Sequence, residues 1–393
     1  MKDRIKAYMK KEAVLCVAAA LALITSFVVP PSAAYLGYVD YRVLALLFSL
    51  MIVVAGLSGM GVFDRLLKAL LNVVHSMRQL VMVLVMVCFI TSMWITNDVA
   101  LITFVPFAIM VLNRLGKSDR LIPVIVLQTV AANLGSMCTP IGNPQNLYLY
   151  SVSGINIAAF LKLLLPITIV SLVLLIISVL IMKNEKLENS GSEGVVNDEV
   201  VNEEVVNKRV VNKGAVGEKS DKGWKLVAWG GLFLLSILTV LHLVDYRITL
   251  IVVIVVAAVI DPKLFKNVDY SLLITFVAFF IFVGNMKNIE WFSSFIAGCI
   301  NGREIMVSVI ASQCISNVPA AVLLSGFTHN YEDLMLGTNI GGLGTLIASM
   351  ASLISYKMYI GTPKANVKRY IVMFTLINAA FLVVLLGVVY IIR

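Results

Sequence analysis

Charge, histidine and cysteine are all scarce in this chain of 393 residues. Charged residues make up 13% of it and hydrophobic residues 60%, against about 25% charged and about 45–50% apolar in soluble domains. This balance excludes a soluble globular protein. The five cysteines lie singly within apolar segments, without the CxxC or Cys/His spacing of a metal or redox centre. With no Ser/His, His-rich zinc or paired-Asp set at membrane depth, we expect no enzyme.

The net charge of +9 does not indicate a nucleic-acid partner. The lysines and arginines lie in short loops between apolar segments, whereas a nucleic-acid-binding protein gathers them on one face. They act instead as signals of membrane topology. The three histidines, His75, His242 and His329, lie near the ends of apolar segments, so we expect them at the membrane interface and not as metal ligands.

Long apolar runs predict an all-α polytopic membrane protein. A helix crosses a bilayer with about 20 apolar residues, and two interrupted segments added to seven ordinary runs give about nine full crossings. The first run follows a basic N-terminus but has no clear cleavage site, so we expect a retained helix and not a removed signal peptide. The ordinary runs are 13–31, 43–62, 158–181, 224–243, 248–260, 270–284 and 370–391.

Four other apolar segments are interrupted near their centres by Asn, Gly, Pro, Ser and Thr. We interpret segments 79–112 and 304–328 as re-entrant hairpins, and segments 121–150 and 333–356 as broken helices. Cations flank the first hairpin at both ends, and the cation-rich N-terminus is predicted to be cytoplasmic, so this hairpin enters from the cytoplasm. The second hairpin has mixed-to-acidic flanks and is predicted to enter from outside.

The two halves of the chain repeat each other around these interruptions. Thr96-Asn97-Asp98 aligns with Ser316-Asn317-Val318, and AANLGSMCTPIGNPQNLYLYS aligns with GTNIGGLGTLIASMASLISYK. Val39-Asp40-Tyr41 and Val268-Asp269-Tyr270 each precede a crossing that leads toward a hairpin. Similar halves of opposite orientation are typical of inverted-repeat transporters, whose site lies at the interface of the repeats.

A polar stretch separates the halves. Residues 1–182 form the first half, residues 224–393 the second, and residues 183–223 the connection between them. The connection carries the repeat VVNDE VVNEE VVNKR VVNKG, whose five-residue period fits neither a helix nor a strand. We interpret it as a mobile cytoplasmic linker, with an amphipathic interaction segment as the alternative.

The four interruptions supply the chemistry expected of a transport site. Irregular backbone at membrane depth survives only where it lines a cavity or is buried in protein. Carbonyl oxygens at helix C-terminal ends hold cations, and N–H groups at helix N-terminal ends attract anions. The candidate ion- and substrate-binding residues are Thr96, Asn97, Asp98, Asn133, Gly135, Thr139, Pro140, Gly142, Asn143, Pro144, Asn146, Ser316, Asn317, Val318, Pro319, Asn339, Gly341, Gly342, Gly344 and Thr345.

Asp98 is the only acidic residue of the first hairpin, and its counterpart Val318 is neutral. An ionisable side chain at membrane depth indicates function by default. Asp98 can cap the helix that follows it, contact a coupling cation, or carry a proton. The sequence leaves these three roles open.

At four motifs the chain resembles the ion-transporter superfamily of citrate-transporter-like permeases, divalent-anion/sodium symporters and arsenite permeases. The motifs are, in order, TNDVALITFVPFA, NLGSMCTPIGNPQN, SNVPAAVLL and NIGGLGTLIASMASL, and they look most like the anion-permease branch. The resemblance implies scaffold and transport portions, a homodimer and an elevator-like displacement.

In the symporters of that superfamily a Ser-Asn-Thr motif at each hairpin tip contacts sodium and substrate. The resemblance therefore implies Na⁺ at the Asn97 and Asn317 tips. Both tips depart from the motif at the third residue, where this chain has Asp98 and Val318. An Asn-Asp tip is also similar to the arsenite permeases, so efflux stays open.

We expect a secondary active transporter of a small anion, either a carboxylate or an inorganic oxyanion. Its expected partners are the substrate, the bilayer of the inner (plasma) membrane and a second copy of the chain. It needs a coupling Na⁺ or H⁺ and no other cofactor or structural metal. The alternative is a cation/proton antiporter or arsenite-type efflux permease in which Asp98 couples transport to protons.

Overall fold

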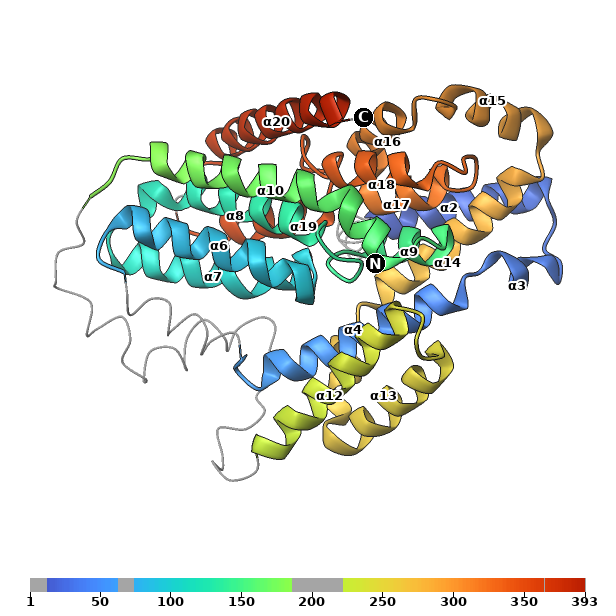
Figure 1. The fold of residues 1–393 in the computed structure, drawn as a ribbon, viewed down its shortest axis with the longest axis horizontal. Coiled ribbons are helices and arrows are strands. Elements are labelled where there is room, and N and C mark those ends of the chain that lie inside the picture. The colour runs from blue at the N-terminus through green and yellow to red at the C-terminus, as the bar shows by residue number, and fades with distance from the viewer. Residues whose placement is uncertain (1–12, 63–73, 186–221, 364, 393) are drawn as a thin grey trace, which may run out of the picture. The chain divides into compact units, whose positions relative to one another are not determined.

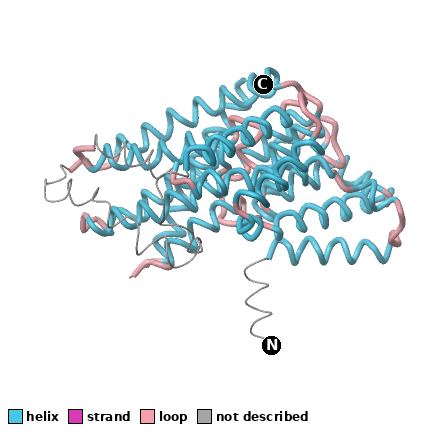
Figure 2. The backbone as a smooth tube through the Cα atoms, turned by 90° about the horizontal axis from the view of Figure 1, so that it is seen from below, coloured by secondary structure: helices cyan, strands magenta, loops and turns pink. Residues whose placement is uncertain are grey.

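In the computed structural model the regular elements of the described residues are all helices (Figures 1 and 2). Outside the described residues lie most of the predicted linker 183–223 and some of the cations used to predict topology. The orientation of the chain in the membrane therefore stays a prediction. The described residues are 13–62, 74–185, 222–363 and 365–392.

Helices occupy all seven of the ordinary apolar runs. Within the described residues, seven helices are long and apolar enough to cross a membrane, or up to eight if the bent pair 290–300 and 304–315 is one span. The prediction of about nine crossings counted α2 and α13, which are shorter than the roughly 20 residues that a crossing needs. The helices on the ordinary runs are α2 (Ala13–Val28), α4 (Tyr41–Gly59), α10 (Ile157–Ile181), α12 (Lys222–Val240), α13 (Tyr246–Ile260), α14 (Tyr270–Lys287) and α20 (Val367–Ile392).

Each predicted hairpin is a pair of packed helices separated by one residue, Thr96 in the first and Ser316 in the second. With 12 and 8 residues, α16 and α17 are too short to cross a bilayer singly. With 19 and 18 residues, α6 and α7 are each long enough, so the re-entrant path of the first hairpin stays a prediction. The pairs are α6 (Met77–Ile95) with α7 (Asn97–Arg114), and α16 (Glu304–Ile315) with α17 (Asn317–Leu324).

Both predicted broken helices are interrupted at the Gly- and Pro-containing runs. The sequence did not predict α15 (Glu290–Ile300), a short helix whose Trp291 and Phe295 are exposed. The broken helices are α8 (Leu121–Ser136) with α9 (Pro144–Ser153), and α18 (Tyr331–Ile340) with α19 (Met350–Ile360). The short connecting helices are α3 (Ala34–Tyr38), η1 (Ser118–Arg120) and η2 (Pro262–Asn267).

The chain divides into two compact units, and it passes from one to the other at both helix breaks. Unit 1 comprises 1–56, 144–163 and 231–342, and unit 2 comprises 57–143, 164–230 and 343–393. In unit 1, α14 packs on α2, α16 on α18, and α17 on α9. In unit 2, α6, α7, α19 and α20 all pack on α8, which is buried along nearly its whole length.

Two aspartates begin equivalent helices in the two halves. The Asp40 carboxylate accepts a hydrogen bond from the backbone N–H of Val43 at 3.0 Å, and Asp269 accepts one from Leu272 at 3.0 Å. A side-chain acceptor at this position satisfies one of the four N–H groups that the first helical turn leaves without a partner. The repeated Val-Asp-Tyr triplet therefore fixes where α4 and α14 start.

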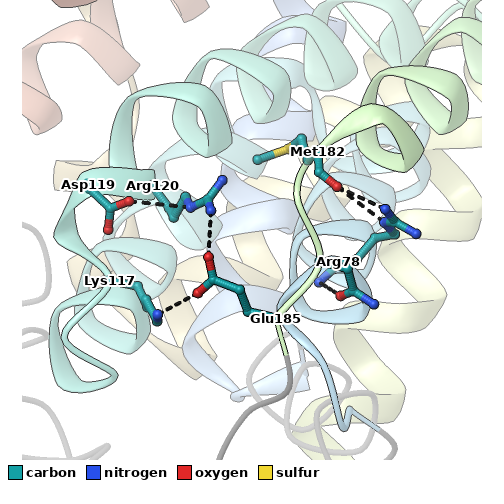
Figure 3. A network of polar contacts seen from close by, with 7 residues as sticks. Arg78, Lys117, Asp119, Arg120, Met182 and Glu185 are labelled. Carbon is teal, nitrogen blue, oxygen red and sulfur yellow. Dashed lines mark hydrogen bonds and ion pairs between the residues drawn. The ribbon is translucent and has the colours of Figure 1, made fainter.

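An ion-pair network joins the end of α10 to the base of the first hairpin in unit 2 (Figure 3). The Glu185 carboxylate accepts hydrogen bonds from Lys117 at 2.5 Å and from Arg120 at 2.9 Å. The Arg78 guanidinium donates to the carbonyl of Met182 at 3.0 Å. The hydrogen bonds from Lys117 and Arg120 lower the pKa of Glu185 below its usual range.

Because the pKa of Glu185 is lower in the folded protein, its ion pairs stabilise the fold above the unfolded pKa of about 4.3. That stabilisation is lost as the pH falls through the lower, folded pKa. Replacing Glu185 with Gln should therefore lower the Tm of the purified protein at pH 7 and change it much less below pH 3. Replacing the exposed Glu290 with Gln is the control; an equal Tm loss at both pH values would contradict the prediction.

Candidate functional site

Both hairpin tips have the same strained backbone. Thr96 has φ 71° and ψ 150°, and Ser316 has φ 75° and ψ 153°, a region almost restricted to glycine that costs about 1–3 kcal/mol. The next residue, Asn97 or Asn317, begins a helix, and its side-chain oxygen accepts from the following backbone N–H at 3.0 Å. Two matching outliers at matching positions make both tips candidates for a functional role.

In unit 2 the tip residue Asn97 belongs to a buried network of amides and hydroxyls. Its amide nitrogen donates to Asn133 Oδ1 at 3.1 Å, and its backbone N–H donates to the carbonyl of Gly142 at 3.1 Å. Ser349 also donates to Asn133 Oδ1, at 3.0 Å, while the amide nitrogen of Asn133 donates to Ser352 at 3.4 Å. These side chains are 4% exposed or less.

The interruption at 137–143 is tied to the same network by its own polar groups. The Thr139 hydroxyl donates to the carbonyl of Met93, near the end of α6. The Asn143 amide donates to Ser136 Oγ at 3.0 Å, and Ser136 donates to the carbonyl of Asn133 at 2.8 Å. These hydrogen bonds give polar groups at the break partners within the protein, as irregular backbone at membrane depth requires.

In unit 1 the second tip lies beside the end of α18. A Cβ on Gly342 would lie 2.9 Å from the amide nitrogen of Asn317, so the glycine lets this amide approach the backbone closely. Asn339 donates to Asn146 Oδ1 at 2.6 Å and to the carbonyl of Met335 at 2.8 Å. Gln313, near the tip, donates to the carbonyl of Gly341 at 2.8 Å.

The two networks follow one pairing rule across the repeat. The alignment that sets Asn133 on Asn339 also sets Asn146 on Ser352. Asn133 bonds Ser352 of the second half, and Asn339 bonds Asn146 of the first half. Each asparagine on the first part of a broken helix is thus paired with the second part of the other broken helix.

The candidate residues thus fall into two groups. Unit 2 brings together Asn97, Asn133, Thr139, Gly142 and Asn143 with the first tip, and unit 1 brings together Asn317, Asn339, Gly341, Gly342 and Asn146 with the second. That all four interruptions meet in one pocket stays a prediction. Gly135 lies in the last turn of α8, and the other candidates lie in the breaks or in the first turn of the next helix: Thr96, Asp98, Pro140, Pro144, Ser316, Val318, Pro319, Gly344 and Thr345.

Sequence reasoning missed the serines of these networks. Ser136 and Ser349 were not candidates, and for Ser352 the sequence balances function evenly against packing, although each bonds Asn133 or Asn143. The repeat alignment sets Ser349 on the candidate Asn143 and Ser352 on the candidate Asn146. Transferring the candidates from one half to the other by this alignment would have found both.

Neutral dipoles dominate the chemistry of both networks. The residues that make the contacts above are amides, hydroxyls and glycines, and α7 and α17 begin at the tips with their N-terminal ends. Asp98 lies half-buried in the first turn of α7, where a negative charge is favoured by the helix dipole. Such an arrangement can offer oxygen atoms, N–H groups and helix ends to a small ion, without a lysine or arginine among these contacts.

The helices are those of a polytopic membrane protein, and its family and relatives are membrane transporters. The model of the citrate transporter family matches residues 5–330, so the chain belongs to the citrate transporter family. This confirms the superfamily inferred from the four motifs.

Several relatives are similar to the chain. An uncharacterized transporter of Methanocaldococcus jannaschii is 28% identical over 89% of this chain and 89% of its own length. Inner membrane protein YbiR of Escherichia coli is 28% identical over 81% of this chain and 80% of its own length. A silicon efflux transporter of Oryza sativa is 31% identical over 37% of this chain and 30% of its own length.

The helix crossing beside the first tip requires a glycine. A Cβ on Gly135 would collide with the carbonyl of Phe89 and with Ser92 Oγ, and its counterpart Gly341 similarly faces Ser312. Replacing Gly135 with Ala should destabilise the protein by about 1–3 kcal/mol through overpacking. Thermal unfolding in detergent measures this loss.

Replacing Gly59 with Ala is the matched control, because a Cβ there has no neighbour within 4 Å. We expect its stability to stay within about 0.5 kcal/mol of the wild type. Equal Tm values for the two variants would show that α6 and α8 do not pack as closely as described.

Proposed function

We propose that the chain is a secondary active transporter that moves a small anion, a carboxylate or an inorganic oxyanion, across the inner membrane. A sodium or proton gradient drives it. The observation that carries the proposal is the pair of strained tips, Thr96-Asn97 and Ser316-Asn317, each followed by a helix N-terminus and each beside a buried asparagine network. Membership of the citrate transporter family supports it.

The helix starts at the hairpin tips and the helix ends at the breaks have separate roles in this proposal. The N–H groups at the starts of α7 and α17 attract the anion. The amide and hydroxyl oxygens at the tips and the carbonyls at the ends of α8 and α18 hold a coupling Na⁺. Asn97 and Asn317 are the central contacts, and the protein works as a homodimer.

Reconstituted liposomes with imposed Na⁺ or H⁺ gradients test the proposal against a panel of carboxylates and oxyanions. We expect gradient-dependent uptake of one of these anions. Replacing Asn97 or Asn317 with Ala should lower kcat/KM about tenfold or more, since a hydrogen bond to a charged group contributes about 1.5–3 kcal/mol and about 1.4 kcal/mol is a factor of ten.

Replacing Asn378 with Ala is the matched control. Asn378 is a buried asparagine of α20 that bonds the carbonyl of Phe374 within its own helix and takes no part in the asparagine networks. This variant should retain transport per folded molecule. Absence of gradient-dependent flux for every anion tested would reject the proposed function.

The half-buried Asp98 favours a second candidate, proton-coupled antiport or arsenite-type efflux. A relative named putative transporter arsB, from Dictyostelium discoideum, is 32% identical over 28% of this chain and 20% of its own length. In this candidate the Asp98 carboxylate takes up and releases the transported proton.

Replacing Asp98 with Asn tests the proton-carrying role of Asp98 because Asn keeps the shape of the side chain and can still cap α7. If Asp98 carries the proton, the variant should lose all stimulation of flux by a pH gradient. Internal pH measured with a trapped dye during transport reports this directly. Proton movement that persists at the wild-type rate would leave Asp98 as a helix cap or cation contact.

A further inference from the structure

A cavity of about 570 Å³ lies at the base of the second hairpin, within unit 1. None of the candidate tip and break residues lines it, so it is separate from the site proposed above. The lining residues that matter here are Glu304, Thr328 and the asparagines Asn301 and Asn330.

Glu304 is a buried carboxylate with incomplete pairing. It is 4% exposed, and its Oε1 accepts a hydrogen bond from the Thr328 hydroxyl at 3.0 Å. Its Oε2 is buried and has no hydrogen-bond partner among the described residues, and no Lys, Arg or His of that part of the chain pairs with it. Carboxylates are almost never fully buried unless they are paired. We therefore expect a hydrogen-bond donor or a cation at Oε2.

The repeat shows that the packing at this position does not require an acid. The alignment that sets Asn97 on Asn317 also sets Leu84 on Glu304. Leu84 is fully buried in α6, so an apolar side chain fills the equivalent place in the first hairpin. Glu304 is therefore a difference between the halves that brings a charge into a position where burial alone opposes it.

The start of α16 explains only part of this arrangement. Glu304 is the first residue of that helix, where the dipole favours a carboxylate. An exposed side chain would gain the same benefit without the cost of burial. The dipole also does not explain why the second carboxylate oxygen is buried without a hydrogen-bond partner beside a cavity.

We propose that this cavity binds a small monovalent cation such as Na⁺, held by the Glu304 carboxylate and the neutral oxygens of Thr328, Asn301 and Asn330. Hard cations take carboxylate, hydroxyl, amide and carbonyl oxygens as ligands. One carboxylate neutralises one positive charge, which favours a monovalent over a divalent ion. Arg303, which precedes Glu304 in the chain, is exposed, so its charge is screened by solvent more than that of Glu304 is. His329 also lines the cavity, and its side chain is exposed.

The test measures cation binding to the purified full-length protein. Thermal unfolding is followed while Na⁺ replaces N-methyl-D-glucamine at constant ionic strength, and ²²Na⁺ binding gives a Kd. We expect a saturable, Na⁺-dependent rise in Tm, and a Kd about tenfold or more weaker in Glu304→Gln. That variant keeps an acceptor for Thr328 but removes the charge.

Two further variants keep the outcome decisive. Thr328→Val leaves the carboxylate in place and removes one neutral ligand, so it should weaken Na⁺ binding severalfold even if Glu304→Gln fails to fold. Asn97→Ala removes a contact of the proposed transport site, so Na⁺ that still binds to this variant with the affinity of the Glu304 cavity is not held at the first hairpin tip. This control separates failure of the cation site from failure of the proposed transport site.

Three results would overturn the proposal. The first is a wild-type protein whose Tm and ²²Na⁺ binding do not depend on any of Na⁺, Li⁺ and K⁺, which would leave water or a proton at Glu304. The second is unchanged Na⁺ binding in Glu304→Gln. The third is loss of all Na⁺ binding in Asn97→Ala with no effect of Thr328→Val, which would place the ion at the hairpin tip.

Discussion

The structure depends on satisfying backbone groups where helices stop inside an apolar protein. A peptide N–H or carbonyl without a partner costs several kcal/mol in lipid, so each interruption must bring its own hydrogen-bond partners. At the first tip the backbone N–H of Asn97 finds the carbonyl of Gly142, and Thr139 covers the carbonyl of Met93. The asparagine networks supply hydrogen-bond partners at the places where the helices are broken. Each break also produces helix ends, whose N–H and carbonyl groups can contact ions.

The two networks share a plan but differ in chemistry. Asn133 is bonded by two serines and by the Asn97 amide, while Asn339 bonds the amide of Asn146. One tip continues with Asp98 and the other with Val318. Two networks with unequal side chains can bind two different species, which is what coupling a substrate to an ion requires.

Local chemistry made most of the helix breaks predictable. Asn, Gly and Pro interrupt otherwise apolar runs, and the structure breaks the helices there, with Thr96 and Ser316 as single-residue separators. The crossed pairing of Asn133 with Ser352 joins residues 219 positions apart, and no local pattern reports such a contact. The sequence did not predict α15 because its 11 residues are too short for a crossing. The structure shows two of its aromatic residues exposed. Glu304 was not among the candidate residues, since its burial depends on how the second hairpin packs.

The crossed pairing also sets an order for biosynthesis. Asn133 enters the membrane early, but its partners Ser349 and Ser352 follow 216 and 219 residues later. The first half of the chain must therefore wait in the bilayer with part of its asparagine network open to other polar groups. Final assembly can occur only after the ribosome has delivered nearly the whole protein, and neither half alone can complete its own unit.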